Sequence, residues 1–176
     1  MPESAKGLIL IHTGDGKGKS TSAFGAAMRF IGQGFNVGMV QFMKGQWKTG
    51  EAEAANIFGE QFEIFSFGEG FSWEVKDPER NRQAVEQAWA KCLEMLRDDH
   101  YQMVIFDEIN IALQMNLLSS GEVMDALKKK PPAKHVILTG RGAPSELIEI
   151  ADLVTEMKCV KHPFDQGTPA QRGIEY

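Results

Sequence analysis

A short apolar run leads directly into a glycine- and lysine-rich stretch and then into a segment of helical periodicity. Residues 8–25 are LILIHTGDGKGKSTSAFG. The pattern predicts a strand over residues 7–12 and a helix that starts near Lys19 and ends at Gly32. Residues 18–20 supply the end of the phosphate-loop pattern G-x-x-x-x-G-K-[ST], in the strand-before and helix-after context that the pattern requires. This feature restricts the chain to an α/β architecture.

The same stretch predicts how an anion would be bound. Glycines adopt positive φ without penalty, so the loop N–H groups can turn toward phosphate oxygens beside the positive end of a helix. Thr13 stands where the pattern has its first glycine. We expect Lys19 to cover the phosphates and the Ser20 hydroxyl to hold Mg²⁺. The residues expected to bind the nucleotide are Gly14, Asp15, Gly16, Lys17, Gly18, Lys19, Ser20 and Thr21, joined by Arg141.

Apolar runs of strand length alternate with helical segments along the rest of the chain, which is typical of a mostly parallel sheet covered by helices on both faces. A long helix is expected to have Asp77 as its N-cap and Pro78 at its first position. Its apolar stripe includes Trp89 and Cys92, which are therefore expected in the core. The prediction is one domain, residues 1–176, with a three-layer, P-loop NTPase-like (RecA-like) α/β fold. Further strands are expected at residues 36–42, 62–67, 101–108 and 134–141, with a weaker one at 153–160.

Two carboxylates end the predicted strand at 101–108. Asp107 and Glu108 follow the apolar residues MVIF, as in a Walker B motif. Carboxylates at this position hold Mg²⁺ directly or through water. Together with Ser20 they form the expected metal site. Arg141, after the next apolar strand, is placed to reach the same phosphates with a planar fork of donors.

Two loops stand out because they follow predicted strands at the edge where open parallel sheets bind ligands. Residues 43–55 are MKGQWKTGEAEAA and residues 68–77 are GEGFSWEVKD. Both combine glycine with tryptophan. Both loops are therefore expected at the ligand-binding edge of the sheet.

Charge and composition exclude some functions. The formal net charge is −5, which argues against a general nucleic-acid or anionic-membrane binder. No run of 18 apolar residues appears, and the N-terminus lacks an apolar signal core. Cys92 and Cys159 form no CxxC pair. We expect a cytoplasmic protein without a disulfide framework.

From these residues alone the chain is predicted to be a P-loop enzyme that acts on a magnesium-bound nucleotide. A hydrolase would need a residue that orients water, and Glu108 is a candidate. A small-molecule kinase would need a base and usually a mobile lid. A non-catalytic ATP-dependent binding module is a third possibility.

A resemblance separates these alternatives. The segments TGDGKGKSTSAFG, GEGFSW, DEIN, LTGRGAP and EMKCVKHPFDQGTPAQRGIEY occur in this order. They resemble those of the P-loop cob(I)alamin (corrinoid) adenosyltransferases from residue 8 to residue 176. The loop of that family usually has T-G-N-G-K-G-K-T-T, so Asp15 and Ser20 are departures. Ser20 keeps a hydroxyl, whereas Asp15 replaces an amide donor.

The resemblance implies the reaction ATP + cob(I)alamin → adenosylcobalamin + triphosphate, with a corrinoid precursor as an alternative acceptor. It implies that ATP lies reversed in the loop, so that the ribose C5′ faces the reduced cobalt. Phe71 and Trp73 would lie against the corrin and displace its lower axial base. Lys19 and Arg141 would stabilise the departing triphosphate. A flavoprotein electron donor and a homodimer are also implied.

Overall fold

The computed structural model describes residues 6–42, 44, 49–68 and 78–174, and in this part of the chain six parallel strands form one sheet. The strand order is β3-β2-β4-β5-β1-β6, and every pairing between neighbours is parallel. All carboxyl ends of the strands therefore meet at one edge. The strands are β1 (Ile9–Thr13), β2 (Val37–Gln41), β3 (Phe62–Ser66), β4 (Met103–Asp107), β5 (His135–Thr139) and β6 (Leu153–Glu156).

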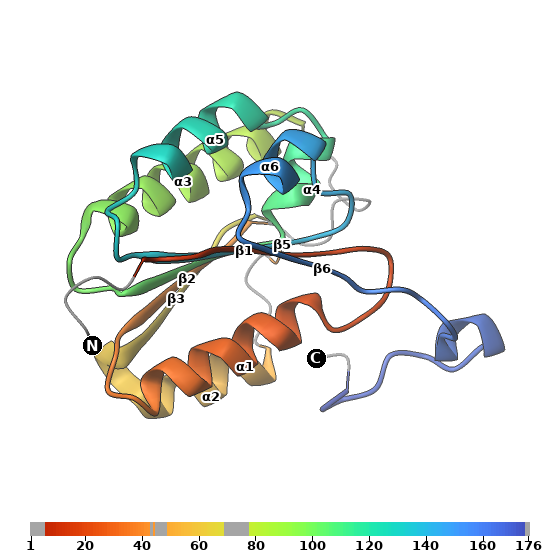
Figure 1. Ribbon diagram of the computed structural model, residues 1–176. Helices are drawn as coiled ribbons and strands as arrows, with labels where there is room; N and C mark the ends of the chain where they lie inside the picture. Colours follow the sequence, from red (N-terminus) through yellow and green to blue (C-terminus); the bar gives the residue numbers. More distant parts are fainter. Residues whose placement is uncertain (1–5, 43, 45–48, 69–77, 175–176) are drawn as a thin grey trace.

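Helices cover both faces of the sheet (Figure 1). On one face lie α1 (Lys19–Ile31) and α2 (Gly50–Ala55), the latter followed by the 3₁₀ helix η1 (Asn56–Gln61). On the other lie α3 (Pro78–Arg97), α4 (Ile109–Gln114), α5 (Ser120–Lys129) and α6 (Ser145–Ile150). Past β6 the chain leaves the layers and passes through η2 (Pro163–Gln166). The expected three-layer α/β arrangement is confirmed, with a sheet that is parallel throughout.

The core is divided by the sheet into two clusters. Successive side chains of a strand point to opposite faces, so β4 contributes Val104 and Phe106 to the side of α3, and Met103 and Ile105 to the side of α1. The ring of Trp89 packs edge-on against Phe106, with centroids 6.0 Å apart. Cys92, on the same helix as Trp89, is fully buried. Cys92 thus occupies the core, and Trp89 is half-buried and packs against it from the same helix face.

Strand ends differ from the predicted ends for a backbone reason. β4 stops at Asp107 because Glu108 takes a left-handed conformation, with φ 64°, and precedes α4. β5 stops at Thr139 because Gly140 has φ 126°. The last strand, β6, is shorter than predicted and exposed along its length. The predicted N-cap of the long helix, Asp77, lies outside the described residues.

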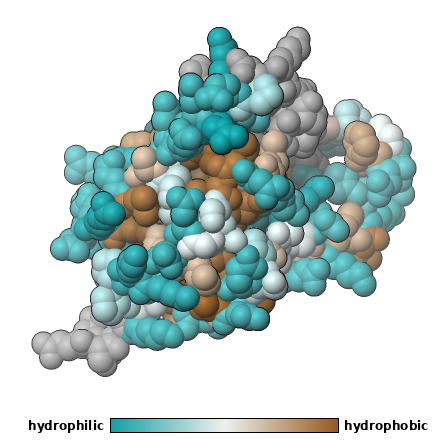
Figure 2. Space-filling model, turned by 90° about the horizontal axis from the view of Figure 1, so that it is seen from above, coloured by the Kyte–Doolittle hydropathy of each residue, from teal (hydrophilic) through white to brown (hydrophobic). Residues whose placement is uncertain are grey.

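The outer face formed by α3, α5 and α6 is largely hydrophilic, with apolar side chains showing between the charged ones (Figure 2). This is the distribution expected for amphipathic helices packed on a sheet. None of the described helices combines the length and apolarity needed to cross a bilayer.

Candidate active site

The glycine-rich loop closes around the side chain of Lys19. The loop leaves β1 after Thr13, and α1 begins at Lys19 with Gly18 as its N-cap, at φ 111°. The Lys19 Nζ donates to the carbonyl oxygens of Gly14, at 2.8 Å, and Gly16, at 2.6 Å. Burial lowers the pKa of Lys19, and the neighbouring charge of Glu108 acts in the opposite direction. The ammonium is thus held by two carbonyl oxygens of the loop itself.

The chain that follows β6 packs against the outside of this loop. The N–H of Gly16 donates to the carbonyl of Met157 at 2.6 Å, and the N–H of Met157 donates to the carbonyl of Thr13 at 2.7 Å. A Cβ on Gly16 would lie 2.7 Å from the carbonyl carbon of Lys158 and 2.8 Å from the Met157 oxygen. Glycine is required here by the close approach of a second backbone. The sequence pattern did not indicate this contact.

Asp107 is the fully buried centre of a hydrogen-bonded cluster at the carboxyl edge. The Thr139 hydroxyl donates to its Oδ1 at 2.8 Å. The Gln41 amide donates to its Oδ2 at 3.1 Å, and the Lys44 ammonium lies 3.2 Å from the same oxygen. The Ser66 hydroxyl donates to the Gln41 amide oxygen at 2.8 Å, which fixes the amide orientation. Both carboxylate oxygens of Asp107 are therefore occupied by protein donors.

The carboxylate of Glu108, unlike that of Asp107, has an oxygen that no protein donor occupies. Its backbone N–H donates to the Thr139 hydroxyl at 2.9 Å, while its buried Oε2 finds no hydrogen-bond partner among the described residues. Burial raises the pKa of Glu108, and the adjacent charge of Asp107 raises it further. The charges of Lys44, Lys19 and Arg141 oppose this shift. A buried carboxylate oxygen without a donor is a candidate ligand for a cation.

The loop after β5 is tied to the rest of the site at two points. The Asn110 amide donates to the carbonyl of Gly140 at 2.9 Å, and a Cβ on Gly140 would lie 2.9 Å from the Asn110 Cβ. The N–H of Ala143 donates to the Thr13 hydroxyl at 3.0 Å. Between these anchors Arg141 is exposed, and its charge influences the pKa values of both Lys19 and Glu108.

The structure therefore brings most of the predicted site residues to one edge of the sheet. Lys19 and Glu108 lie in the interior of the cluster, and Ser20 lies half-buried in the first turn of α1. Phe71 and Trp73 lie outside the described residues. Exposed residues of the loop and first helical turn complete the predicted set, namely Asp15, Lys17 and Thr21. Sequence reasoning missed Gln41, Lys44 and Thr139, although each stands at or just past the end of a predicted strand.

A family model supplies the decisive comparison. The model described as ATP:corrinoid adenosyltransferase BtuR/CobO/CobP matches residues 5–176. The chain belongs to the corrinoid adenosyltransferase family. Members of this family adenosylate corrinoids in an ATP-dependent reaction.

Curated corrinoid adenosyltransferases resemble the chain over nearly its whole length. The protein from a Sinorhizobium species is 49% identical, with coverage of 97% of this chain and 81% of the relative. The protein from Pseudomonas aeruginosa is 44% identical, with coverage of 97% and 84%. The protein from Escherichia coli K12 is 40% identical, with coverage of 99% and 88%.

A solved structure supports the fold of this corrinoid adenosyltransferase family member. The flagellar accessory protein FlaH from Methanocaldococcus jannaschii superposes with a TM-score of 0.57 at 16% identity, covering 86% of this chain and 71% of that chain. At this identity the likeness concerns the fold alone. It agrees with the three-layer α/β arrangement of the sheet and its helices.

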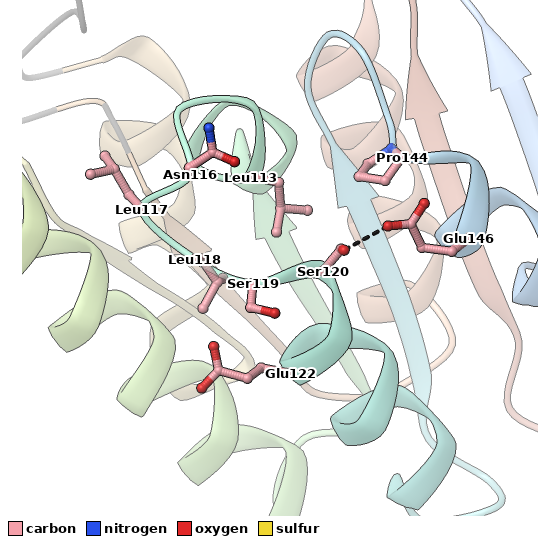
Figure 3. A pocket seen from close by; sticks show the side chains of 9 residues that line it. All are labelled: Leu113, Asn116, Leu117, Leu118, Ser119, Ser120, Glu122, Pro144 and Glu146. Atoms are coloured by element: carbon pink, nitrogen blue, oxygen red, sulfur yellow. Dashed lines mark hydrogen bonds between the residues drawn. The ribbon is translucent and has the colours of Figure 1, made fainter.

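A separate hollow of about 590 Å³ opens between α4, α5 and the start of α6 (Figure 3). It is lined by leucines of the α4–α5 connection and by two carboxylates, Glu122 and Glu146. Two of its lining residues are joined by a hydrogen bond, which the Ser120 hydroxyl donates to Glu146 at 2.6 Å (Figure 3). Among the residues that the structure describes, none of the predicted nucleotide-binding residues lines this hollow, so it is distinct from the glycine-rich loop.

Proposed function

We propose that the chain transfers the 5′-deoxyadenosyl group of ATP to the reduced cobalt(I) of a corrinoid and releases triphosphate. The electron pair of cobalt(I) forms the cobalt–carbon bond at C5′. The C5′–O bond breaks, and its electron pair leaves with the triphosphate. One observation carries the proposal. In a chain of the corrinoid adenosyltransferase family, a glycine-rich loop holds the Lys19 ammonium at the edge of the sheet where Asp107 and Glu108 also lie.

In this reaction the protein positions two reactants and stabilises a leaving group. Cobalt(I) carries no proton, so no general base is required at the nucleophile. The loop N–H groups of residues 14–20, Lys19 and Arg141 would hold the triphosphate. Thr21, Asp15 and Lys17 would contribute from the exposed side of the loop. Phe71 and Trp73 are proposed to face the corrin on the strength of the sequence motif alone.

Magnesium is proposed as the resident metal, because the site offers the oxygen donors that Mg²⁺ prefers. Mg²⁺ in nucleotide sites is held by one or two carboxylates together with phosphate oxygens and water. The unpartnered Oε2 of Glu108 and the Ser20 hydroxyl are suitable donors. Asp107 fits as a residue that orients its neighbours, because its oxygens already accept from Thr139 and Gln41. Bound Mg²⁺ would offset charge on the departing triphosphate.

The remaining proposals concern the electron donor, the cellular compartment and the oligomeric state. A flavoprotein would reduce the corrinoid, and the protein would act in the cytoplasm. A homodimer is proposed as well. Strongly exposed apolar side chains in the C-terminal segment, at Val160, Phe164 and Ile174, support a contact with a second copy.

Product analysis tests the transferase proposal. The protein is incubated with Mg·ATP and a chemically reduced corrinoid, and the phosphate products are separated and identified. Intact triphosphate together with a light-sensitive cobalt–carbon product is the expected result. ADP and orthophosphate formed without corrinoid would instead support a hydrolase. A phosphorylated acceptor would support a kinase, and binding without turnover would support a binding module.

A further inference from the structure

The loop after β2 places a lysine inside the site, at a position for which the sequence pattern assigned no role. Lys44 lies three residues past the end of β2, and its side chain is 22% exposed. Its ammonium lies 3.2 Å from Oδ2 of the fully buried Asp107. A cation this close to the acid pair is part of the electrostatics of the site.

The ammonium is also located relative to α1. It lies 6.0 Å from the centroid of the Phe24 ring. Phe24 stands one turn after Ser20, on the same face of α1. Lys44 therefore lies between the end of β4 and the first turns of α1.

The ammonium of Lys44 lies in acidic surroundings. The carboxylates of Asp107, Glu51 and Glu108 all act on it, and Asp107 is in direct contact with it. An ammonium carries three donors, whereas Asp107 is the one acceptor that forms an ion pair with it among the described residues. Such a cation is suited to hold further oxygen atoms.

From this geometry we propose that Lys44 is a second phosphate-binding lysine of the site, anchored by Asp107 and directed at the triphosphate from the end of β2. The proposal deepens the proposed function and rests on it. It assigns Asp107 to positioning Lys44, in parallel with the carbonyl oxygens of the loop that position Lys19.

A simpler role would be neutralisation of Asp107 alone, and the experiment separates the two. In Asp107→Asn the amide oxygen can still accept a hydrogen bond from Lys44 and hold it in place, but it carries no charge to be neutralised. The Lys44→Met change made on that background therefore tests for contacts of the lysine beyond neutralisation of Asp107. Affinity for tripolyphosphate and for Mg·ATP is measured by titration calorimetry on Asp107→Asn and on the double variant. Circular dichroism and thermal unfolding verify that both are folded.

Lys91→Met is a matched control. The Lys91 side chain is 19% exposed, pairs with Glu94 at 2.7 Å and lies 4.1 Å from the Phe65 ring centroid, in α3 on the other face of the sheet. When Lys91→Met is made on the same Asp107→Asn background, the lost side-chain volume and ring contact resemble those of Lys44→Met, and the control loses an ion pair in addition. Its affinity for tripolyphosphate is expected to remain within about twofold of the parent.

The double variant is expected to bind tripolyphosphate and Mg·ATP about tenfold or more weakly than Asp107→Asn, which corresponds to the loss of one charge-assisted hydrogen bond. Equal affinities of the two variants would overturn the assignment. Failure of the proposed function would give another result. The unmodified protein would release no triphosphate in the product analysis, although the double variant would still bind tripolyphosphate more weakly than Asp107→Asn.

Discussion

The hydroxyl of Thr13 accepts a hydrogen bond from the backbone N–H of Ala143 at 3.0 Å, although the two residues are 130 positions apart. This contact joins the end of β1 to the loop that carries Arg141. It gives a physical reason for threonine at the position where the phosphate-loop pattern has glycine. Two sides of the candidate site are thereby held in one arrangement.

Thr13→Val keeps the side-chain shape but leaves the Ala143 N–H without its acceptor. We expect a loss of about 1–3 kcal/mol of stability, since Thr13 is buried. In a chain of this size each kcal/mol lowers the melting temperature by about 2–4 °C. Turnover is expected to fall as well, because the Arg141 loop loses an anchor. Thr13→Ser retains the hydroxyl and serves as control; a Val variant equal to it in melting temperature and kcat/KM would refute the role.

Gly16→Ala tests the packing of the loop against the segment after β6. The new Cβ would meet backbone atoms of Met157 and Lys158 below 3 Å, so the loop must shift and ATP affinity is expected to drop. Gly25→Ala is the matched control, because nothing lies within 4 Å of the place that its new methyl group would take on α1. There alanine is expected to stabilise the helix by about 0.5–1 kcal/mol. Equal ATP affinities of the two variants, measured by calorimetry, would contradict the packing argument.

Lys19→Ala removes the central cation of the loop. By analogy with the removal of one electrostatic donor, we expect a loss of about 2–4 kcal/mol of transition-state stabilisation. The measurement is kcat/KM for triphosphate release with reduced corrinoid. Lys128→Ala, an exposed change in the last turn of α5, is the comparison and should leave kcat/KM unchanged. A similar rate for both variants would remove Lys19 from the proposed machinery.

Trp73→Ala tests the role that the sequence motif implies for the aromatic loop. The variant is expected to bind ATP normally and to lose much more turnover when cobalt(II) has to be reduced in the site than when cobalt(I) is supplied. The reason is that removal of the lower axial donor eases reduction of the metal but contributes less once the metal is already reduced. Rates are compared with both forms of the corrinoid, and equal losses would speak against the assigned role.

The two cysteines are expected to differ in reactivity. Cys92 is fully buried, and burial raises its pKa well above the ordinary value, whereas Cys159 is exposed. A thiol reagent should therefore modify one cysteine quickly in the native protein and the second only after unfolding. Cys159→Ser should abolish the fast phase; a fast phase that persists would show that Cys92 is accessible.

The same shift sets a pH dependence. The folded protein keeps Cys92 protonated above the pKa of the unfolded chain, so the contribution to stability is complete below about pH 8.5 and is lost as the pH rises beyond it. Urea unfolding at increasing alkaline pH measures this loss. Cys92→Ala should give a shallower alkaline decline, and an unchanged slope would exclude Cys92 as its source.

The local pattern of the sequence was sufficient for the main elements of the fold. The strand–loop–helix unit at Lys19, the buried stripe with Trp89 and Cys92, and the acids at the end of β4 all follow from periodicity and from glycine and proline positions. These are short-range properties, because a helix or strand face is defined within a few residues of the chain. Strand ends were less predictable, since Glu108 and Gly140 leave the strand conformation only in their tertiary setting.

The tertiary structure alone decided which side chains meet at the acid pair. Parallel pairing places Gln41 between Ser66 on β3 and Asp107 on β4, which builds the hydrogen-bonded cluster from three separate segments. The contacts of Lys44 with Asp107, and of Met157 with Gly16, likewise depend on the strand order. Sequence periodicity records which face a residue occupies but not which strand lies beside it. The sequence therefore predicts the phosphate loop, whereas the charged and polar side chains around it are brought together by the strand order and register of the sheet.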